Sequence, residues 1–424
     1  MMKRVVITGM GVVAPNGTGI TAFTEAIKSG RSGVRFNPFM AEKKMGCQVA
    51  GMPEYDIAAL SNYFNEFTLR SLKNTGIIFG CLSGIEAWLH AGLPIDPDSP
   101  ADWDCGCIFG TNACDLNMIR WGMELVDSCE NRKLGSRYVE QQMGNGAAGY
   151  LTGLMGFGNQ VFANSSACST GTEAVVMAYE RIRSGKAKRM LAGSTEAASE
   201  YIWSGFDAMR VLTRKNNEAP EKASRPFSAT AAGFVPGAGS GALVLEELET
   251  ALQRGATIYA EVAGGAVNSG GQRTGGSMTA PNPRGVQRCI AAALESASIQ
   301  PGEIDLICGH LTATMADPLE IENWAIALNR SGNDFPYINA LKSMTGHCLG
   351  GSGSIETVAA VLQLHQGFIH PSINCNDLHP NISRQIPESK IPVTLQHHPV
   401  NTIIKANFGF GDVNASIILK KYHL

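Results

Sequence analysis

A cysteine surrounded by small residues lies between an apolar segment and a helical pattern. Cys168 stands in the sequence SSACSTG, after a stretch that begins at Val161 and before a helix that we expect to end at Gly185. At a helix N-terminus the free backbone amides and the dipole favour a thiolate, which lowers the pKa of a cysteine. Small neighbours leave room for a substrate carbonyl. The segment predicts a nucleophile, with a buried structural cysteine as the alternative.

Two histidines follow similar apolar segments in the second half of the chain. His310 comes directly after the stretch Ile304–Cys308, and His347 ends the sequence KSMTGH, which begins at Lys342. One histidine at a strand end is ordinarily structural. A reactive thiol needs groups that position and polarise an acyl substrate, however, and imidazole does this in many enzymes. We therefore expect both histidines to lie near the thiol.

The elements that carry these residues occur twice. Stretches rich in Val and Ile begin near Arg4 and Thr257, and a strand followed by a short helix separates them. Each half then contains a strand, a polar turn and an amphipathic helix, within 161–185 and 335–367. Strands that alternate with helices predict an α/β fold with largely parallel sheets. If the halves are related by a pseudo-two-fold axis, the turns that hold the thiol and the second histidine face each other.

The domain boundary is predicted near residue 250, within the segment of that strand and short helix, which ends at Gly255. The first domain would span 1–250 and carry the cysteine, and the second would span 251–424 and carry both histidines. A chain of 424 residues with 44% hydrophobic residues is long enough for two such units. Further along, each of the two amphipathic helices is followed by a segment that we predict to be one strand, beginning at Arg189 and at Asn401.

Composition excludes several classes of function. The net charge of -3 gives no overall attraction to nucleic acid or to an anionic membrane. The 11 cysteines show no CxxC pair and no zinc spacing, so we expect no metal site and a reducing, cytoplasmic location. The N-terminal segment lacks the cleavage pattern of a secretory signal, and no apolar run is long enough to span a membrane. Gly9–Ala14 nearly matches a dinucleotide fingerprint, but Pro15 follows it, which favours a strand and a turn.

Together, the motifs resemble those of the β-ketoacyl-acyl-carrier-protein synthases of the thiolase superfamily, and most closely the elongating Cys-His-His type. The likeness rests on Cys168 in SACSTG, His310 in GHLTAT, Lys342 and His347 in KSMTGH, and the tail NFGFGDVNAS, and it covers essentially the whole chain. It implies a thiolase-like fold, in which two pseudo-symmetric α/β halves form a layered α-β-α-β-α core. Starter enzymes of this fold have Asn where this chain has His347.

The resemblance implies a decarboxylative condensation. Cys168 would carry an acyl group that malonyl carrier protein then extends, and the amides of Cys168 and Phe408 would form the oxyanion hole. His310 and His347, as neutral imidazoles, would donate from Nε2 to the malonyl thioester oxygen. Lys342 would order the site by pairing with Glu320.

The resemblance also implies how substrates bind. No cofactor is expected beyond the phosphopantetheine arm of an acyl carrier protein, which Thr312 and Thr314 would hydrogen-bond and near which Thr279 would lie. Carrier protein would dock on the basic residues Arg70, Lys73, Arg214 and Lys215, although ordinary solvated charge is the alternative for each of them. Ala113 would line the far end of the acyl tunnel, at the interface of a homodimer or of a heterodimer with a chain-length-factor-like subunit.

Several positions depart from the family pattern. Leu311 stands where the family has Gly, Ser277 where it often has His, Asp412 and Val413 where it has Gly-Thr, and Ala238 where it has Glu. These departures make a specialised polyene or polyketide pathway an alternative to primary fatty-acid synthesis. Two alternative functions are less consistent with the sequence. Chain-length factors lack the nucleophilic cysteine, and a thiolase would carry a second catalytic cysteine in the tail.

Overall fold

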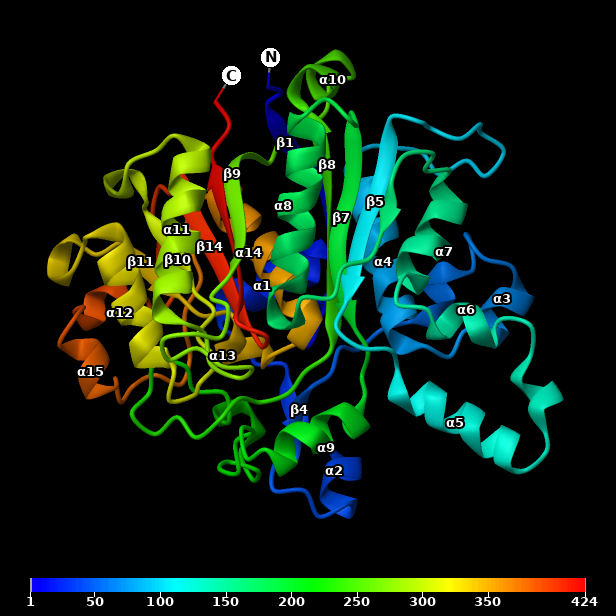
Figure 1. The fold of residues 1–424 in the computed structure, drawn as a ribbon, viewed down its shortest axis with the longest axis horizontal. Coiled ribbons are helices and arrows are strands. Elements are labelled where there is room, and N and C mark those ends of the chain that lie inside the picture. The colour runs from blue at the N-terminus through cyan, green and yellow to red at the C-terminus, as the bar shows by residue number, and fades with distance from the viewer. Residues whose placement is uncertain (1, 424) are drawn as a thin grey trace.

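The computed structural model describes residues 2–423, and a mixed β-sheet forms its centre (Figure 1). The sheet has eleven strands in the order β11-β10-β14-β15-β9-β1-β8-β7-β5-β6, with β2 paired to β1. Its strands are β1 Val5–Ala14, β2 Gly17–Thr18, β5 Cys105–Thr111, β6 Val161–Phe162, β7 Arg189–Glu196, β8 Gly239–Glu247, β9 Ala260–Ser269, β10 Leu306–Cys308, β11 Tyr337–Asn339, β14 Thr402–Gly409 and β15 Val413–Lys420. Two small sheets pair β3 Val34–Phe36 with β4 Val49–Gly51, and β12 Phe368–Ile369 with β13 Gln396–His397.

The α-helices lie on both faces of this sheet and at its ends (Figure 1). They are α1 Ile20–Ser29, α2 Pro38–Glu42, α3 Glu66–Ser71, α4 Thr75–His90, α5 Leu116–Asp127, α6 Tyr138–Gln142, α7 Gly146–Met155, α8 Thr170–Arg183, α9 Glu200–Ala208, α10 Leu248–Gln253, α11 Pro283–Ala297, α12 Asp317–Leu328, α13 Lys342–Thr345, α14 Ser352–Gln366 and α15 Pro380–Ser383. Among the described residues, none of the helices combines the length and the apolar character that a membrane crossing requires.

The order of strand pairings is the same in the two halves of the sheet. In the first half, β1 pairs antiparallel with β8, and β8 pairs antiparallel with β7. Strand β7 then pairs parallel with β5, and β5 pairs parallel with β6. In the second half, β9 pairs antiparallel with β15, and β15 pairs antiparallel with β14. Strand β14 then pairs parallel with β10, and β10 pairs parallel with β11. The halves meet where β1 pairs with β9 over Val5–Ile7 and Ala260–Val262. A domain boundary after residue 250 stays a prediction.

The prediction of largely parallel sheets is wrong, because antiparallel pairs form the middle of the sheet. The C-terminal segment, predicted to be one strand, folds into the hairpin β14-β15. Gly411, with φ 87°, and Asp412, with φ 60°, take the left-handed conformation that a tight reversal of the chain requires. The N-terminal prediction is confirmed: a buried strand is followed by the turn that leads into β2.

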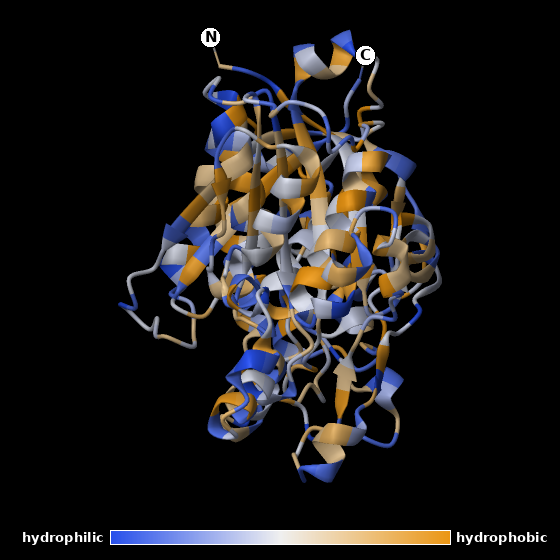
Figure 2. Cartoon of the chain, turned by 90° about the vertical axis from the view of Figure 1, so that its right-hand side faces the viewer, coloured by the Kyte–Doolittle hydropathy of each residue, from blue (hydrophilic) through white to orange (hydrophobic). Residues whose placement is uncertain are grey.

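Helices α8 and α14 form the central layer of the molecule. Each contacts strands of both halves, and each contacts the other, so they lie between the two parts of the sheet. Helices α4 and α7 cover the outer face of one half, and α11 and α12 that of the other (Figure 1). The predicted α-β-α-β-α layering is confirmed. Figure 2 shows hydrophobic residues concentrated in the strands and hydrophilic ones in the peripheral helices and loops.

Small residues let the two central helices approach closely. The hydroxyl of Ser354, in α14, is 2.7 Å from that of Ser194, in the neighbouring strand β7, and the two are hydrogen-bonded. A Cβ atom added to Gly171 would lie 2.3 Å from the backbone nitrogen of Ser354 and 2.4 Å from the Ser194 hydroxyl. The N-terminal turns of α8 and α14 therefore meet almost backbone to backbone, and this contact fixes the two loops that precede them.

We expect Gly171→Ala to destabilise the protein by about 1–3 kcal/mol, because the new methyl group overpacks a rigid backbone contact. Gly149→Ala in α7 is the matched control. Its added Cβ meets no atom within 4 Å, and alanine raises helix stability by up to about 1 kcal/mol. Thermal unfolding of both variants and the parent tests this. Equal melting temperatures for the two variants would contradict the close approach.

Candidate active site

The predicted cysteine and the two predicted histidines come together at the N-terminal ends of α8 and α14. The Cys168 sulfur lies 3.1 Å from His347 Nε2, and the rings of His310 and His347 meet edge to face with centroids 5.4 Å apart. One side-chain atom from each of the three residues fits within 4.8 Å of the others. The predicted convergence is confirmed. Just before the thiol, Ala167 adopts φ 49°, a left-handed conformation that an alanine takes at a cost.

His347 is held as a neutral donor. Its Nδ1 accepts hydrogen bonds from the backbone N–H of Leu349, at 3.2 Å, and from the Ser352 hydroxyl, at 2.9 Å. Because the N–H of Leu349 can only donate, Nδ1 is unprotonated and the ring proton resides on Nε2, beside the cysteine sulfur. Burial, and then the charge of Lys342, lower the pKa of His347 well below its usual value. The ring is therefore neutral at physiological pH.

His310 has the same tautomer for a different reason. Its Nδ1 accepts a hydrogen bond from the Asn407 side-chain amide at 3.0 Å, and the Lys342 ammonium lies 3.5 Å away. Both neighbours are donors, so the proton of His310 also resides on Nε2. Burial lowers the pKa of His310 well below its usual value, and the charges of Lys342, His347 and Lys405 lower it further. These protonation states agree with the two neutral Nε2 donors predicted from the sequence.

Two acidic residues of α12 hold the loop that follows His310. Glu320 accepts hydrogen bonds from the backbone N–H groups of His310 and Leu311, each at 2.7 Å. Asp317 accepts one from the N–H of Thr312 at 3.0 Å. Leu311, which stands where the family has Gly, adopts φ 21°, a left-handed value that glycine takes more easily. The carboxylates therefore stabilise a strained loop that carries the histidine.

The predicted pair of Lys342 and Glu320 is wrong. The Lys342 ammonium binds the carboxylate of Glu356 and donates to the backbone carbonyl of His310 at 2.7 Å. Both oxygens of Glu320 are occupied by the backbone amides described above, whereas α14 brings Glu356 directly beside the lysine. Burial opposes the ionisation of Glu356, but Lys342 and Lys405 lower its pKa.

The thiol pKa also differs from the prediction. Burial raises the pKa of Cys168 to about 11, although Lys342 and a hydrogen bond from a backbone amide act in the opposite direction. The residue is partly exposed, but its sulfur lies in low-dielectric surroundings that disfavour a thiolate more than the helix terminus favours it. The expected lowering is therefore wrong for the free protein, whose cysteine is a neutral thiol beside a neutral imidazole.

The backbone amide that approaches this sulfur belongs to Phe410, not to the predicted Phe408. Phe408 lies within β14, paired with Asn414, and its ring packs 6.1 Å from that of His310. The strand ends at Gly409, which lies beside the backbone of Cys168, and Phe410 follows it in the turn. The amides of Cys168 and Phe410 are therefore the candidate oxyanion hole.

The Cys-His-His set does not fit a metal ion despite its compactness. A histidine that binds a metal through Nε2 must protonate Nδ1 and donate from it. Here Nδ1 of each histidine faces donors, the N–H of Leu349 and the amide of Asn407. The charges of Lys342 and Lys405 act on the ring of His310, and that of Lys342 also acts on His347, so they would repel a second positive charge.

The residues predicted to bind the substrate arm are only partly brought together. Thr312 and Thr314 are half-buried, and their hydroxyls are 3.0 Å apart. Thr314 also lines a surface groove of about 830 Å³ that extends along α12. Thr279, by contrast, is exposed on the loop between β9 and α11, where its N–H donates to the hydroxyl of Ser277.

Asp412, one of the departures from the family pattern, fastens this loop. Its buried carboxylate accepts hydrogen bonds from the backbone N–H groups of Gln272 and Asn282, each at 2.8 Å. Gly411 adds a backbone hydrogen bond to the carbonyl of Met278. The turn that carries Phe410 and the loop between β9 and α11 are therefore held together.

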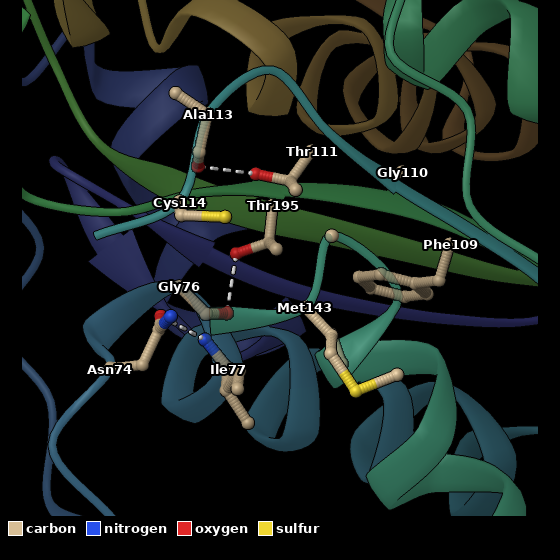
Figure 3. Close-up of a pocket in the computed structure, with 12 residues that line it drawn as sticks. Asn74, Gly76, Ile77, Phe109, Gly110, Thr111, Ala113, Cys114, Met143 and Thr195 are labelled. Carbon is tan, nitrogen blue, oxygen red and sulfur yellow. Dashed lines mark hydrogen bonds between the residues drawn. The ribbon is translucent and has the colours of Figure 1, made fainter. Parts of the chain in front are cut away.

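Ala113 lines a small cavity of about 20 Å³ beyond the end of β5 (Figure 3). Figure 3 shows the side chains of Cys114, Met143 and Phe109 around it, and Thr195, which donates to the carbonyl of Gly76. Its remaining lining residues are Asn74, Ile77, Gly110, Thr111, Gly144 and Ala147. The lining is mostly apolar, and the space holds little more than one water molecule.

The predicted docking residues are exposed but lie at two places. Arg70 is on α3 and Lys73 follows it, whereas Arg214 lies 3.8 Å from Asp207 of α9, with Lys215 beside it. Figure 1 shows α3 and α9 at different edges of the molecule. The chain therefore does not bring the four cations into one patch.

The sequence offered a signal for two residues that the prediction missed. Glu356 interrupts the apolar helix α14, and Lys405 interrupts the buried strand β14. A charged residue inside an apolar element is rarely buried unless it is paired. Together these two positions could have been predicted as a buried ion pair.

We expect alkylation of Cys168 by iodoacetamide to accelerate about tenfold per pH unit between pH 7 and pH 9, because a pKa of about 11 makes the thiolate fraction rise tenfold per unit below it. Mass spectrometry of the Cys168 peptide, with Cys168→Ala to assign the label, measures this. A rate that levels off near pH 7 would mean that the helix terminus outweighs burial.

Comparison with known proteins agrees with this geometry. Two family models match the chain, "Beta-ketoacyl synthase, N-terminal domain" over residues 2–251 and "Beta-ketoacyl synthase, C-terminal domain" over residues 259–376. The 3-oxoacyl-[acyl-carrier-protein] synthase 1 of Escherichia coli K12 is 32% identical over 425 residues, 99% of each chain. The chloroplastic synthase I of Arabidopsis thaliana is 33% identical over 428 residues, 99% of this chain and 87% of the relative.

Solved structures give the same result. A beta-ketoacyl synthase from Burkholderia phymatum STM815 has a TM-score of 0.89 at 30% identity, and the ishigamide ketosynthase/chain length factor has 0.88 at 26%. A type II PKS ketosynthase in complex with its acyl-carrier protein has 0.86 at 28%. All three alignments cover both chains fully. The chain belongs to the β-ketoacyl synthase family.

Proposed function

We propose that the chain joins an acyl group carried on Cys168 to the two-carbon unit of malonyl carrier protein, giving a 3-ketoacyl carrier protein and carbon dioxide. As a β-ketoacyl synthase it is an acyltransferase. The observation that carries the proposal is the pair of neutral histidines, His310 and His347, whose Nε2 protons are fixed by donors at Nδ1. Such rings can stabilise a developing oxyanion without protonating it.

The first half-reaction transfers the acyl group. The sulfur of Cys168 forms a bond to the acyl carbonyl carbon, the thioester bond to the carrier arm breaks, and the cysteine proton leaves with the arm's thiol. The oxyanion of the tetrahedral intermediate accepts hydrogen bonds from the amides of Cys168 and Phe410. One such donor is worth about 3 kcal/mol of barrier.

The second half-reaction forms the new carbon–carbon bond. The malonyl carboxylate leaves as carbon dioxide, and the electron pair of the broken bond moves onto the enolate of the thioester, whose oxygen accepts from His310 and His347. The α-carbon attacks the acyl group on Cys168. The carbon–sulfur bond breaks, and the released thiolate takes a proton from solvent.

The partner and the carrier arm belong to the same proposal. The acyl chain would arrive on the phosphopantetheine arm of an acyl carrier protein, with Thr312 and Thr314 along its path. The relative solved with its acyl-carrier protein supports this partner. Thr279 and the basic residues at α3 and α9 stay proposals, with two docking areas rather than one.

The oligomeric state, the pathway and the location are inferred from the edge of the sheet, from single residues and from the cysteines. The short β6 leaves one edge of the sheet open, with Phe162 39% exposed, which suits a homodimer or a heterodimer with a chain-length-factor-like subunit. The intact Cys168 argues that this chain is the condensing subunit. Small Ala113 and the altered loop at Asp412 support a specialised polyene or polyketide pathway. All eleven cysteines are free thiols, which supports a cytoplasmic location.

We expect Cys168→Ala to abolish acyl loading, since it removes the nucleophile. His310→Ala and His347→Ala should still load Cys168, but condensation should fall by at least about 100-fold, the usual scale for one lost oxyanion donor. Intact-mass analysis after incubation with acyl carrier protein measures loading, and product analysis after addition of malonyl carrier protein measures condensation. If the histidine variants fail to load and still decarboxylate malonyl carrier protein, the assigned roles are wrong.

We expect Ala113→Phe to shorten the longest acyl chain accepted, while condensation of short acyl groups stays unchanged. The phenyl group is larger than the cavity of about 20 Å³ at the end of β5 and would block the acyl chain there, and each methylene excluded removes about 0.8 kcal/mol of binding. Competition between acyl carrier proteins of graded chain length measures the profile, with Ala113→Gly as the control that keeps the space open. Identical profiles would show that Ala113 does not set tunnel depth.

A further inference from the structure

A second lysine is buried behind the two histidines and has no part in the mechanism above. Lys405 lies on β14 with a fully buried side chain, and its ammonium is 3.2 Å from one carboxylate oxygen of Glu356. Lys342 occupies the other oxygen of that carboxylate. Two cations therefore share one anion in a region from which water is excluded. An unbalanced buried charge lowers the stability of a protein, so the presence of Lys405 here calls for a physical explanation.

The ammonium of Lys405 determines how the Asn407 amide is oriented. Lys405 and the Thr172 hydroxyl both donate to the oxygen of that amide. The amide nitrogen therefore faces the opposite way, where it donates to Glu356 at 2.9 Å and to Nδ1 of His310 at 3.0 Å. A flipped amide would bring its N–H groups against the ammonium and its oxygen against the histidine, so Lys405 excludes that state.

We propose that Lys405 is a positioning residue for His310: through Asn407 it keeps the proton of His310 on Nε2, and through its charge it keeps the ring neutral. The inference rests on the proposed function, because it concerns malonyl decarboxylation. A neutral Nε2 donor stabilises the oxyanion that forms. An imidazolium would also bind the malonyl carboxylate, and this would stabilise the substrate against losing carbon dioxide.

The charged groups around His310 determine how the removal of Lys405 changes the pKa of the His310 ring. The ring faces Lys342 from α13, His347 and Cys168 from the two helix starts, and the pair of Lys405 and Asn407 from β14. Glu356 of α14 neutralises one of the two lysines. Without Lys405 the remaining pair of Lys342 and Glu356 is neutral overall, so the free-energy cost of protonating the His310 ring falls.

The test compares Lys405→Met with the parent between pH 5.5 and pH 7.5, where Lys405, with a pKa of about 8, is mostly protonated. Malonyl carrier protein decarboxylation and acylation of Cys168 are measured separately. We expect decarboxylation by Lys405→Met to fall most at the acidic end of this range, with its acidic limb about one pH unit higher, because removing the charge raises the pKa of His310. Acylation should stay within about twofold.

Two further variants separate charge from hydrogen bonding. Lys405→Gln keeps a donor for Asn407 without the charge, so its acidic limb should still move while the rate at pH 7.5 falls less than in Lys405→Met. Lys420→Met removes a partly exposed lysine at the end of the neighbouring strand and should leave both half-reactions unchanged.

Loss of both half-reactions in equal proportion with an unmoved acidic limb would overturn the inference and assign Lys405 to packing alone. An unchanged decarboxylation profile would overturn it as well. If the variants do not fold, 15N NMR spectra of the parent with labelled histidines at pH 6 provide the test, with His310→Gln used to assign the signals. A protonated His310 ring rules the inference out. A neutral ring with its proton on Nε2 supports it. A parent that does not decarboxylate malonyl carrier protein would instead refute the proposed function.

Discussion

The close crossing of α8 and α14 is the contact on which the site depends. Gly171 brings the starts of the two helices together between the halves of the sheet, and a hydrogen bond between Ser354 of α14 and Ser194 of β7 holds α14 against that strand. Cys168 directly precedes one helix, and His347 lies just before the other, so their 3.1 Å contact follows from the packing of backbones rather than from flexible side chains. Geometry that rests on buried backbone contacts is rigid, as catalysis by fixed donors requires.

The second requirement is that two histidines in one pocket remain uncharged and identically oriented. The structure achieves this with groups that can only donate, at Nδ1 of each ring, and with cations behind them. Burial and the charges of the nearby lysines favour neutral rings, but neither effect selects a tautomer. The buried ion cluster therefore selects between two neutral forms of His310 that differ only in the position of one proton.

The sequence predicted the catalytic set because position along the chain was enough. Cys168 and His347 precede helices and His310 follows a strand, and such places coincide in space once the halves pack together. Partners of side chains were less predictable. The partner of Lys342 depends on which carboxylate is already satisfied by backbone amides, and this is decided by a loop with an unusual conformation at Leu311.

Strand direction and strand ends were the other points at which the sequence was insufficient. The tail segment was predicted to be one strand although Gly411 and Asp412 interrupt it, and its pairing with β9 and β10 shows that it is two strands. Its turn comes at Gly411, and this shifts the amide near the sulfur from Phe408 to Phe410. The thiol pKa was missed for a similar reason, since burial depends on everything packed around the sulfur, and the helix terminus is only one contribution.

The repeated order of strand pairings has a consequence for the arrangement of such a site. The repeated arrangement supplies two equivalent helix starts that face each other across the seam, and backbone amides are free at both of them. Only one of them has to supply a nucleophile. The other half holds the protons and the buried charges: both histidines, Glu356 and the two lysines all come after β9. The two halves thus divide the work between making a bond and managing charge.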